Sequence, residues 1–294
     1  MSFKDLKSNS RSSFEKLTGE LNKLTSKSES YKDDRIWKPE TDKAGNGYAV
    51  IRFLPAPQNE ELPWVRVFNH GFKGPGGWYI ENSLTTLGQK DPVSEMNSQL
   101  WNSGVDSDKE IARQRKRRLS YFANIYVVSD PKNPENEGKV FLYKFGKKIF
   151  DKIMDKMQPE FEDDEAVNPF DLWTGANFRL KIRKVAGFVN YDKSEFESAS
   201  ALLDGDDEKL ETLWKSQHSL QEFLSPSNFK SYDELKEKLD SVLKGDVRHM
   251  ETAENSNIQQ GESKTTSEDT SSASDDSFEN EDALSYFEKL ANEG

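Results

Sequence analysis

The sequence predicts an α+β protein with a small β-barrel core, appended helices and two long polar ends. Three observations lead to this prediction. Five or six short segments carry the apolar or alternating pattern of β-strands, and three later segments repeat apolar residues at helical spacing. Charged residues make up 32% of the 294 residues and hydrophobic residues only 33%, so part of the chain is expected to stay unfolded.

The predicted strands lie in the first two thirds of the chain, at residues 48–54, 64–68, 121–128, 140–145 and 177–185. A sixth short apolar run, at 78–80, follows a glycine-rich turn at 71–77. A five-stranded oligonucleotide-binding barrel, the OB-fold, fits this count and length. The pattern alone leaves that barrel as one option among several.

Three helices are predicted from apolar residues that recur every three or four positions. The first covers residues 146–157, the second follows Asp206, and the third begins at a capping box formed by Ser231 and Glu234. Their apolar faces contain Ile149, Ile153 and Met157; Leu210, Leu213 and Trp214; and Leu235, Leu239 and Val242. Residues 82–112 are polar and weakly patterned, which predicts an irregular insertion.

The charge distribution divides the chain into an arm, a body and a tail. Residues 1–30, with a net charge of +2, are predicted to form a basic, flexible arm that contains one short helix at Phe14 to Leu24. The body is predicted at 31–245, with the insertion at about 70–112. The tail, 246–294, reads as disordered: residues 251–294 carry -10 of the total of -12 and leave -2 for the rest. Leu284, Phe287 and Leu290 predict a helix in the tail that docks into a partner.

Two basic groups predict a nucleic-acid interface. The first places five cations in six residues, and the second alternates with apolar residues along the strand at 177–185. Cations that follow phosphates, next to aromatic faces that stack on bases, are what a single strand requires. A solvated charged loop is the alternative interpretation of the first group. The two groups are Arg113, Arg115, Lys116, Arg117 and Arg118, and Arg179, Lys181 and Arg183.

The sequence contains no recognisable catalytic or metal site. Cysteine is absent, and none of the three histidines has a second histidine at ligand spacing. No glycine-rich phosphate loop ending in Gly-Lys-Ser/Thr is present, and acidic pairs lie in polar loops. No signal peptide or membrane-spanning segment is seen, so we expect a soluble intracellular protein without enzymatic activity.

Several stretches are similar to one protein family. AGNGYAVIRFLP, VFNHGFKGPGGWYIE, KRRLSYFANIYVVSDP, NPENEGKVFLYKFGKKIFDKI and GANFRLKIRKVAGFVNYD lie in register over about residues 40–195. Together with the acidic tail, they resemble the single-stranded-DNA-binding, helix-destabilising proteins of T-even-type bacteriophages. The resemblance implies an OB-fold with a basic, aromatic-lined cleft that coats single strands cooperatively and without sequence preference.

The resemblance also implies roles in phage DNA replication, recombination and repair within the host cytoplasm. Neighbouring copies would be joined on the DNA by the arm, through Lys4, Lys7 and Arg11, and the tail would recruit replication and recombination proteins. The basic motif at Lys116–Arg118 continues as Leu119-Ser120 rather than the Thr-Ser of the family. The residues that fall near DNA by motif position, with Lys144 added beside them, are Trp78, Trp101, Tyr121, Phe122, Tyr143, Phe188 and Tyr191. For several of these rings, packing in the core is the alternative. Alternation along the strand sends Tyr121 and Phe122 to opposite faces.

The largest departure from the family concerns zinc. Relatives hold a structural zinc in the insertion with one His and three Cys; here His70 is present, Ser83 stands at the first Cys position, and the other two cysteines are also absent. A serine hydroxyl cannot replace a thiolate on zinc, so no cofactor is expected. We expect packing of Trp78, Leu87, Met96 and Trp101 to hold the insertion.

An RNA-binding translational regulator that uses the same cleft is the alternative function. A nuclease would need clustered carboxylates, which the sequence lacks.

Overall fold

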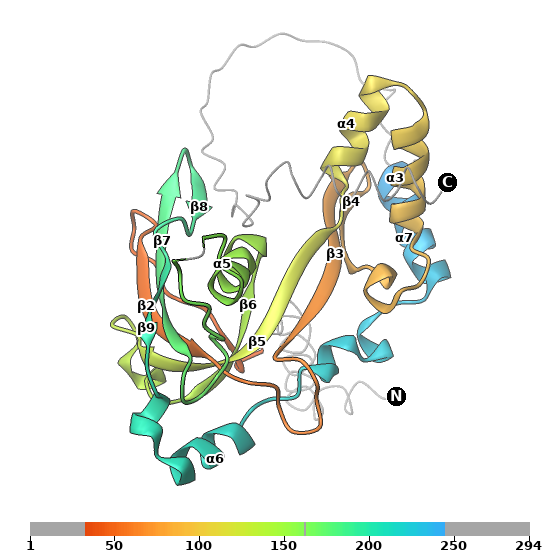
Figure 1. Cartoon of the computed structure of the whole chain (residues 1–294). Coiled ribbons are helices and arrows are strands. Elements are labelled where there is room, and N and C mark those ends of the chain that lie inside the picture. Colours follow the sequence, from red (N-terminus) through yellow and green to blue (C-terminus); the bar gives the residue numbers. More distant parts are fainter. Residues whose placement is uncertain (1–32, 162, 245–294) are drawn as a thin grey trace, which may run out of the picture. The chain divides into compact units, whose positions relative to one another are not determined.

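The computed structural model describes residues 33–161 and 163–244, and it shows an α+β fold (Figure 1). The predicted α+β class is therefore confirmed. The arm with Lys4, Lys7 and Arg11, the acidic tail, and the helices predicted near residues 14–24 and 284–290 lie outside the described residues. The chain divides between Ile36 and Trp37 into two compact units, and the second unit contains strands β2 to β9 and all the described helices.

Every predicted strand is present. The strands are β1 (Ile36–Trp37), β2 (Gly47–Phe53), β3 (Trp64–Gly74), β4 (Gly77–Asn82), β5 (Arg118–Ser129), β6 (Val140–Phe145), β7 (Ala176–Val185), β8 (Phe188–Asn190) and β9 (Glu195–Ala199). The α-helices are α3 (Pro92–Asn102), α4 (Asp106–Gln114), α5 (Lys147–Met157), α6 (Asp207–Lys215) and α7 (Tyr232–Lys244). Short 3-10 turns occur at η1 (Leu84–Leu87), η2 (Pro134–Asn136), η3 (Leu202–Gly205), η4 (Gln221–Leu224) and η5 (Pro226–Asn228).

The prediction of an irregular insertion at 82–112 is wrong, because α3 and α4 occupy much of it. A local signal for α3 was present in the sequence. The side chain of Asp91 caps the helix by accepting from the amides of Val93 and Ser94, and Pro92 stands at the first helical position. These two short helices bury few apolar residues, so the sequence shows no clear apolar repeat at helical spacing there.

The sheet is antiparallel and open. Its strands follow the order β6-β5-β2-β7-β8, while β3 also pairs with β5, β4 with β3, and β9 with β7. A five-stranded OB-fold barrel was predicted; among the described strands β6 does not pair with β7 or β9, so the sheet does not close. Helix α5 follows β6 directly, and its Ile149 and Ile153 are buried in the core of the sheet. The apolar face of α5 thus packs against the core of a sheet in which β6 and β7 do not pair with each other.

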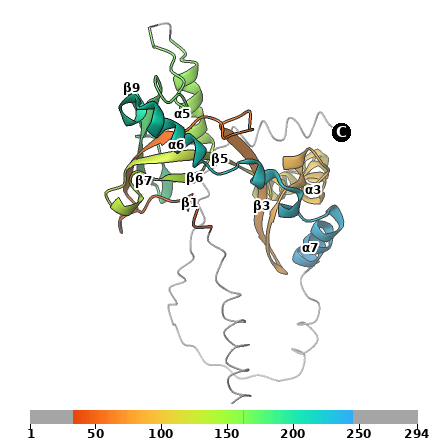
Figure 2. The same ribbon diagram turned by 90° about the horizontal axis from the view of Figure 1, so that it is seen from below.

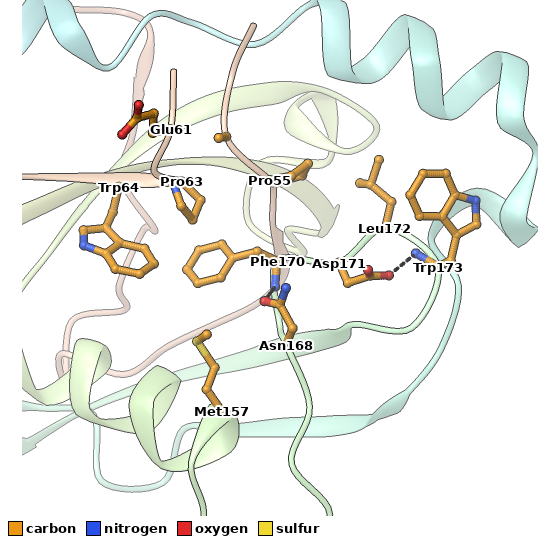
Figure 3. A pocket seen from close by; sticks show the side chains of 11 residues that line it. Pro55, Glu61, Pro63, Trp64, Met157, Asn168, Phe170, Asp171, Leu172 and Trp173 are labelled. Carbon is orange, nitrogen blue, oxygen red and sulfur yellow. Dashed lines mark hydrogen bonds between the residues drawn. The ribbon is translucent and has the colours of Figure 1, made fainter. Parts of the chain in front are cut away.

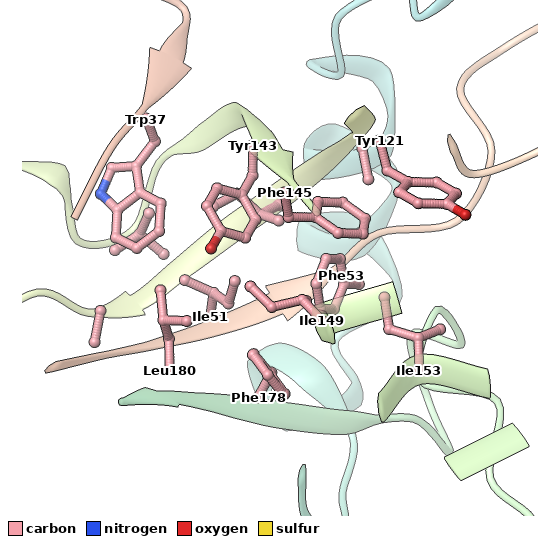
Figure 4. Close-up of a cluster of buried hydrophobic side chains, with 14 of the residues drawn as sticks. Trp37, Ile51, Phe53, Tyr121, Tyr143, Phe145, Ile149, Ile153, Phe178 and Leu180 are labelled. Carbon is pink, nitrogen blue, oxygen red and sulfur yellow. The ribbon is translucent and has the colours of Figure 1, made fainter. Parts of the chain in front are cut away.

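The main core lies within the curved sheet and is rich in aromatic rings (Figure 4). Phe53 of β2 is fully buried, with ring centroids of Phe145 at 5.5 Å and Phe178 at 5.9 Å. The alternation predicted for β7 is confirmed: Phe178, Leu180 and Ile182 are buried, and the basic residues between them lie on the other face. Burial of every second residue therefore fixes which way β7 faces, with its apolar side chains in the core and its basic side chains on the opposite face.

A second core holds the insertion. The β3–β4 hairpin lies against α3 and α7, which are side by side (Figures 1 and 2). Its buried residues are Phe72, Tyr79, Leu84 and Val93, together with Leu235, Leu239 and Val242 of α7. Of the four residues expected to pack here, Met96 does contact this core, whereas Trp78 is 56% exposed. The prediction did not include α7, which supplies Leu235, Leu239 and Val242 to this core. A sequence pattern cannot assign α7 to the insertion, because the helix lies far along the chain.

Candidate nucleic-acid interface

The first basic group emerges from the end of α4 and leads into β5. Cations at a helix C-terminus are favoured by the helix dipole. Arg113 pairs with Glu110 at 3.1 Å, and its guanidinium carbon lies 5.4 Å from the centroid of the Trp101 ring. Trp101 is partly exposed at the end of α3. A cation and a flat ring from neighbouring helices therefore lie together at the start of this segment.

Two further arginines of this group rest on phenyl rings of β3. The guanidinium of Arg115 lies 5.5 Å from the centroid of Phe72, and burial lowers the pKa of this guanidinium. The guanidinium of Arg117 lies 4.2 Å from the centroid of Phe68. Lys116, Arg117 and Arg118 are partly exposed, and Arg118 begins β5 opposite Asn69. The Phe68 ring thus holds the guanidinium of Arg117 in place, while the side chains of Lys116, Arg117 and Arg118 remain partly exposed.

Tyr121 and Phe122 point to opposite faces of β5, as predicted, and both are buried. Tyr121 stacks on Phe150 of α5 with centroids 4.0 Å apart, and Phe122 stacks on Phe223 with centroids 4.1 Å apart. Tyr143 is also buried, edge-on to Trp37 at 5.4 Å. Figure 4 shows Tyr121 and Tyr143 among the core side chains. In this structure these three rings pack against protein.

Fewer of the candidate rings are exposed. Trp78 on β4 and Phe188 on β8 are 56% and 59% exposed. Tyr191 is partly buried and packs against the main core. Lys144 of β6 is exposed, with its Nζ 5.9 Å from the centroid of the Phe122 ring. Trp78 and Phe188, with the partly exposed Trp101, are thus the rings best placed to stack on a base.

The second basic group, on β7, is paired with carboxylates that the sequence analysis missed. Arg179 contacts Glu197 at 3.0 Å, and Lys181 contacts Glu195 at 2.9 Å. Arg183 pairs with Asp192, and this hydrogen bond lowers the pKa of the Asp192 carboxyl. These basic side chains are about two-fifths exposed, at 41%, 39% and 44%. Such exposed pairs are weak, so a phosphate could exchange for the carboxylate at low cost.

The two basic groups lie on different parts of the sheet. The first precedes β5, whose first residues pair with β3. Strand β2, which separates β5 from β7, pairs with the far end of β5 at Ile125–Ser129. The structure therefore brings Arg113 to Arg118 together with Trp101 and Phe68, and it places the β7 group beside β9 instead.

A pocket of about 300 Å³, which the sequence analysis did not single out, opens between β3 and the segment before β7 (Figure 3). Trp64 and Phe170 form one wall, with ring centroids 5.3 Å apart. Asn168 and Asp171 add polar groups, and the backbone amide of Trp173 donates to Asp171 at 2.8 Å. The walls suit a flat or apolar group and contain no nucleophile paired with a base.

Two further observations concern metal ions and membranes. Among the residues described, no group of three or more His, Asp or Glu side chains lies close enough to hold a metal ion. None of the helices in this part of the chain is long and apolar enough to span a membrane.

Comparison with known proteins gives consistent matches. The family model described as gp32 DNA binding protein like matches residues 45–243. The chain is 46% identical over 220 residues to the single-stranded DNA-binding protein of Enterobacteria phage T2, covering 73% of this chain and 72% of that protein. It is 44% identical over 240 residues to the single-stranded DNA-binding protein of Enterobacteria phage T4, covering 79% and 78%. The matched region includes both basic groups and the exposed rings.

Proposed function

Because the chain belongs to the gp32 DNA binding protein like family, we propose that it binds single-stranded DNA without sequence preference. It coats the strands that are displaced during phage DNA replication, recombination and repair, in the cytoplasm of the host. It performs no catalysis. A protein that binds single strands far better than duplex also favours melting of hairpins by mass action.

The observation that carries this proposal is the arrangement of the segment Arg113–Arg118. Its cations lie beside Trp101 and over Phe68, and the exposed rings of Trp78 and Phe188 lie elsewhere on the same unit. Each stacked base contributes about 1–3 kcal/mol whatever its identity, and phosphates are held by charge alone. Neither interaction distinguishes one base from another, which is why we propose non-specific binding.

Other parts of the proposal concern the arm and the tail, which lie outside the described residues, and the core of the sheet and the insertion. Lys4, Lys7 and Arg11 contact a neighbouring copy along the DNA and make binding cooperative. The acidic tail recruits replication and recombination proteins, and in their absence it competes for the cationic surface at high effective concentration. The open sheet of β2, β5, β6 and β7 serves as an OB-type core, and no zinc is bound.

Quenching of tryptophan fluorescence by oligo-dT across a salt series tests the proposal. We expect quenching, and affinity that falls with a slope of about 0.7 log units per bound phosphate for single strands. Absence of quenching together with salt-independent binding would refute it. Competition by oligo-U in place of oligo-dT separates a DNA coat from the alternative, an RNA-binding translational regulator. Labelled single strands incubated with Mg²⁺ should remain intact.

A further inference from the structure

Asp91 joins two parts of the insertion from a buried position. The side chain is almost fully buried, and its Oδ1 accepts from the amides of Val93 and Ser94 at 3.1 and 3.0 Å. Its Oδ2 accepts from the hydroxyl of Ser83 at 3.0 Å and from the amide of Leu84 at 3.1 Å. One carboxylate thus ties the turn η1 to the first turn of α3.

His70 connects this carboxylate to the basic segment. Its Nε2 lies 3.2 Å from Oδ1 of Asp91, and its Nδ1 lies 3.1 Å from the carbonyl oxygen of Arg115. A carbonyl oxygen only accepts, so Nδ1 carries the hydrogen. Asn97 of α3 donates to the same carbonyl at 3.0 Å. Nε2 makes no hydrogen bond to any residue that the structure describes, and it attracts the carboxylate of Asp91 only in the imidazolium form, in which both ring nitrogens carry a hydrogen. In that form the contacts run from Asp91 through His70 to the main chain of Arg115.

Arg115 is the point where the insertion ends and the exposed cations begin. It follows α4 as its C-cap, and its guanidinium contacts the sulfur of Met96 at 3.8 Å as well as the ring of Phe72. Its main chain and its side chain are thus both held by the insertion. The direction of the chain at Lys116 and Arg117 therefore depends on how Arg115 is held.

The contacts of Asp91 do not fit the zinc site implied by the family resemblance. His70 and Ser83 do meet, but at a carboxylate. Both Asp91 oxygens already accept from protein donors, the Ser83 hydroxyl donates to one of them, and the chain has no cysteine. Zinc in a structural site needs four ligands, usually thiolates and imidazoles. This donor set is arranged for hydrogen bonds within the protein.

We propose that Asp91 and His70 are positioning residues which, without a metal, hold the main chain of Arg115 and so present Lys116, Arg117 and Arg118 to a nucleic-acid strand. This inference rests on the proposed function. In this proposal the buried pair of His70 and Asp91 connects β3, η1 and α3 to one another. The same pair also connects these elements to the basic segment through the main chain of Arg115.

A matched pair of substitutions on α3 tests the proposal. Asp91→Asn keeps the shape of the side chain but leaves one oxygen where the surrounding donors now use two. Glu95→Gln changes a carboxylate on the same helix that, within the described part of the chain, accepts a hydrogen bond from Tyr232 of α7 at 2.6 Å. We expect Asp91→Asn to weaken oligo-dT binding about tenfold, because Lys116, Arg117 and Arg118 would lose their fixed position and would have to be ordered when the strand binds. The salt slope should fall by about 0.7 for each phosphate that the variant no longer binds. Glu95→Gln should leave both unchanged.

Asn97→Ala provides a second variant, because it removes one hydrogen bond to Arg115 and leaves Asp91 untouched. It should weaken binding in the same direction as Asp91→Asn, and it decides the outcome if Asp91→Asn fails to fold. Far-ultraviolet circular dichroism at the assay temperature identifies that failure. If folded Asp91→Asn and Asn97→Ala both bind with the affinity and salt slope of the unmodified protein, the proposal is wrong.

Metal analysis gives a readout that does not depend on DNA. The unmodified protein should contain no stoichiometric zinc, and EDTA should not change its thermal unfolding. Stoichiometric zinc in the purified protein would overturn the proposal. An unmodified protein that fails to bind oligo-dT would instead refute the proposed function, so the two failures can be told apart.

Discussion

The guanidinium of Arg117 lies over the ring of Phe68, 4.2 Å from its centroid. Arg117 directly precedes β5, Phe68 belongs to β3, and the Phe68 ring is only partly buried. A cation over an aromatic face is attracted to it, by about 0.5–1 kcal/mol at an exposed site. The basic segment is therefore held by rings of its own protein before any strand arrives, which reduces the entropy lost on binding.

The first prediction concerns Arg117 itself. Arg117→Ala should weaken oligo-dT binding and lower the salt slope by about 0.7, because the variant binds one phosphate fewer. The measurement is a fluorescence titration at several salt concentrations. Lys132→Ala, which removes an exposed cation from the loop between β5 and β6, is the control and should leave the slope unchanged. Equal effects of the two substitutions would indicate general charge attraction instead.

The second prediction separates core rings from binding rings. Tyr121→Ala should destabilise the fold by about 3–5 kcal/mol, as expected for a buried aromatic ring, in denaturant unfolding. Phe188→Ala should change stability by less than about 0.5 kcal/mol, since the ring is exposed. The same change should cost about 1–3 kcal/mol of oligonucleotide binding. Unaltered binding by Phe188→Ala would remove this ring from the interface.

The third prediction concerns the carboxylates that cover the β7 group. Glu195→Gln removes the negative charge that pairs with Lys181 at 2.9 Å and that lies 3.6 Å from Arg179. Binding of oligo-dT should tighten, more at low salt than at high salt, because exposed charges are screened. Stability should change by no more than about 1 kcal/mol. Glu211→Gln, which breaks a comparable pair with Lys215 on α6, is the control. If both leave the affinity unchanged, the β7 group does not contact the strand.

The fourth prediction concerns the acidic tail. Truncation after Met250 removes the segment that carries -10 of the total charge. Binding should become tighter, most clearly to duplex DNA and at low salt, because a tethered competitor has been removed. Unchanged affinity for both forms would contradict the competition.

Deletion of residues 1–25 is the complementary change at the other end. It should reduce cooperativity along a long strand and spare binding to a short oligonucleotide. Filter binding or fluorescence with both lengths measures the difference. Equal losses on the two lengths would show that the arm contributes to binding itself.

The fifth prediction concerns acid stability. Burial acts to raise the pKa of Asp91, but the contact with His70 and the hydrogen bonds from Ser94 and Ser83 outweigh it and lower the pKa from 3.8 to about 2. A lowered folded-state pKa gives stability that is present above 3.8 and is lost as the pH falls toward about 2. The difference in unfolding free energy between the unmodified protein and Asp91→Asn should therefore shrink over that range. A difference that stays constant from pH 6 to about pH 2 would contradict this linkage.

Local patterns were sufficient to predict much of this fold. Strands β2 to β7, the apolar faces of α5, α6 and α7, and the opposite orientation of Tyr121 and Phe122 follow from periodicity, which depends only on neighbouring residues. The short strands β1, β8 and β9 were not predicted. The Asp91-Pro92 start of α3 was readable in the same way but was not used. Charge and composition likewise marked Arg113–Arg118 as a basic group.

Long-range packing set the rest. Whether an aromatic ring lies in the core or on the surface depends on which distant segments cover it: Phe150 covers Tyr121, and Phe223 covers Phe122. Helix α7 completes the core of the insertion from far along the chain, and Glu195 and Glu197 neutralise a strand face that alternation alone showed as cationic. A one-dimensional pattern gives the direction of each side chain relative to its own strand or helix. It does not say what lies opposite, and that neighbour decides burial, pairing and exposure.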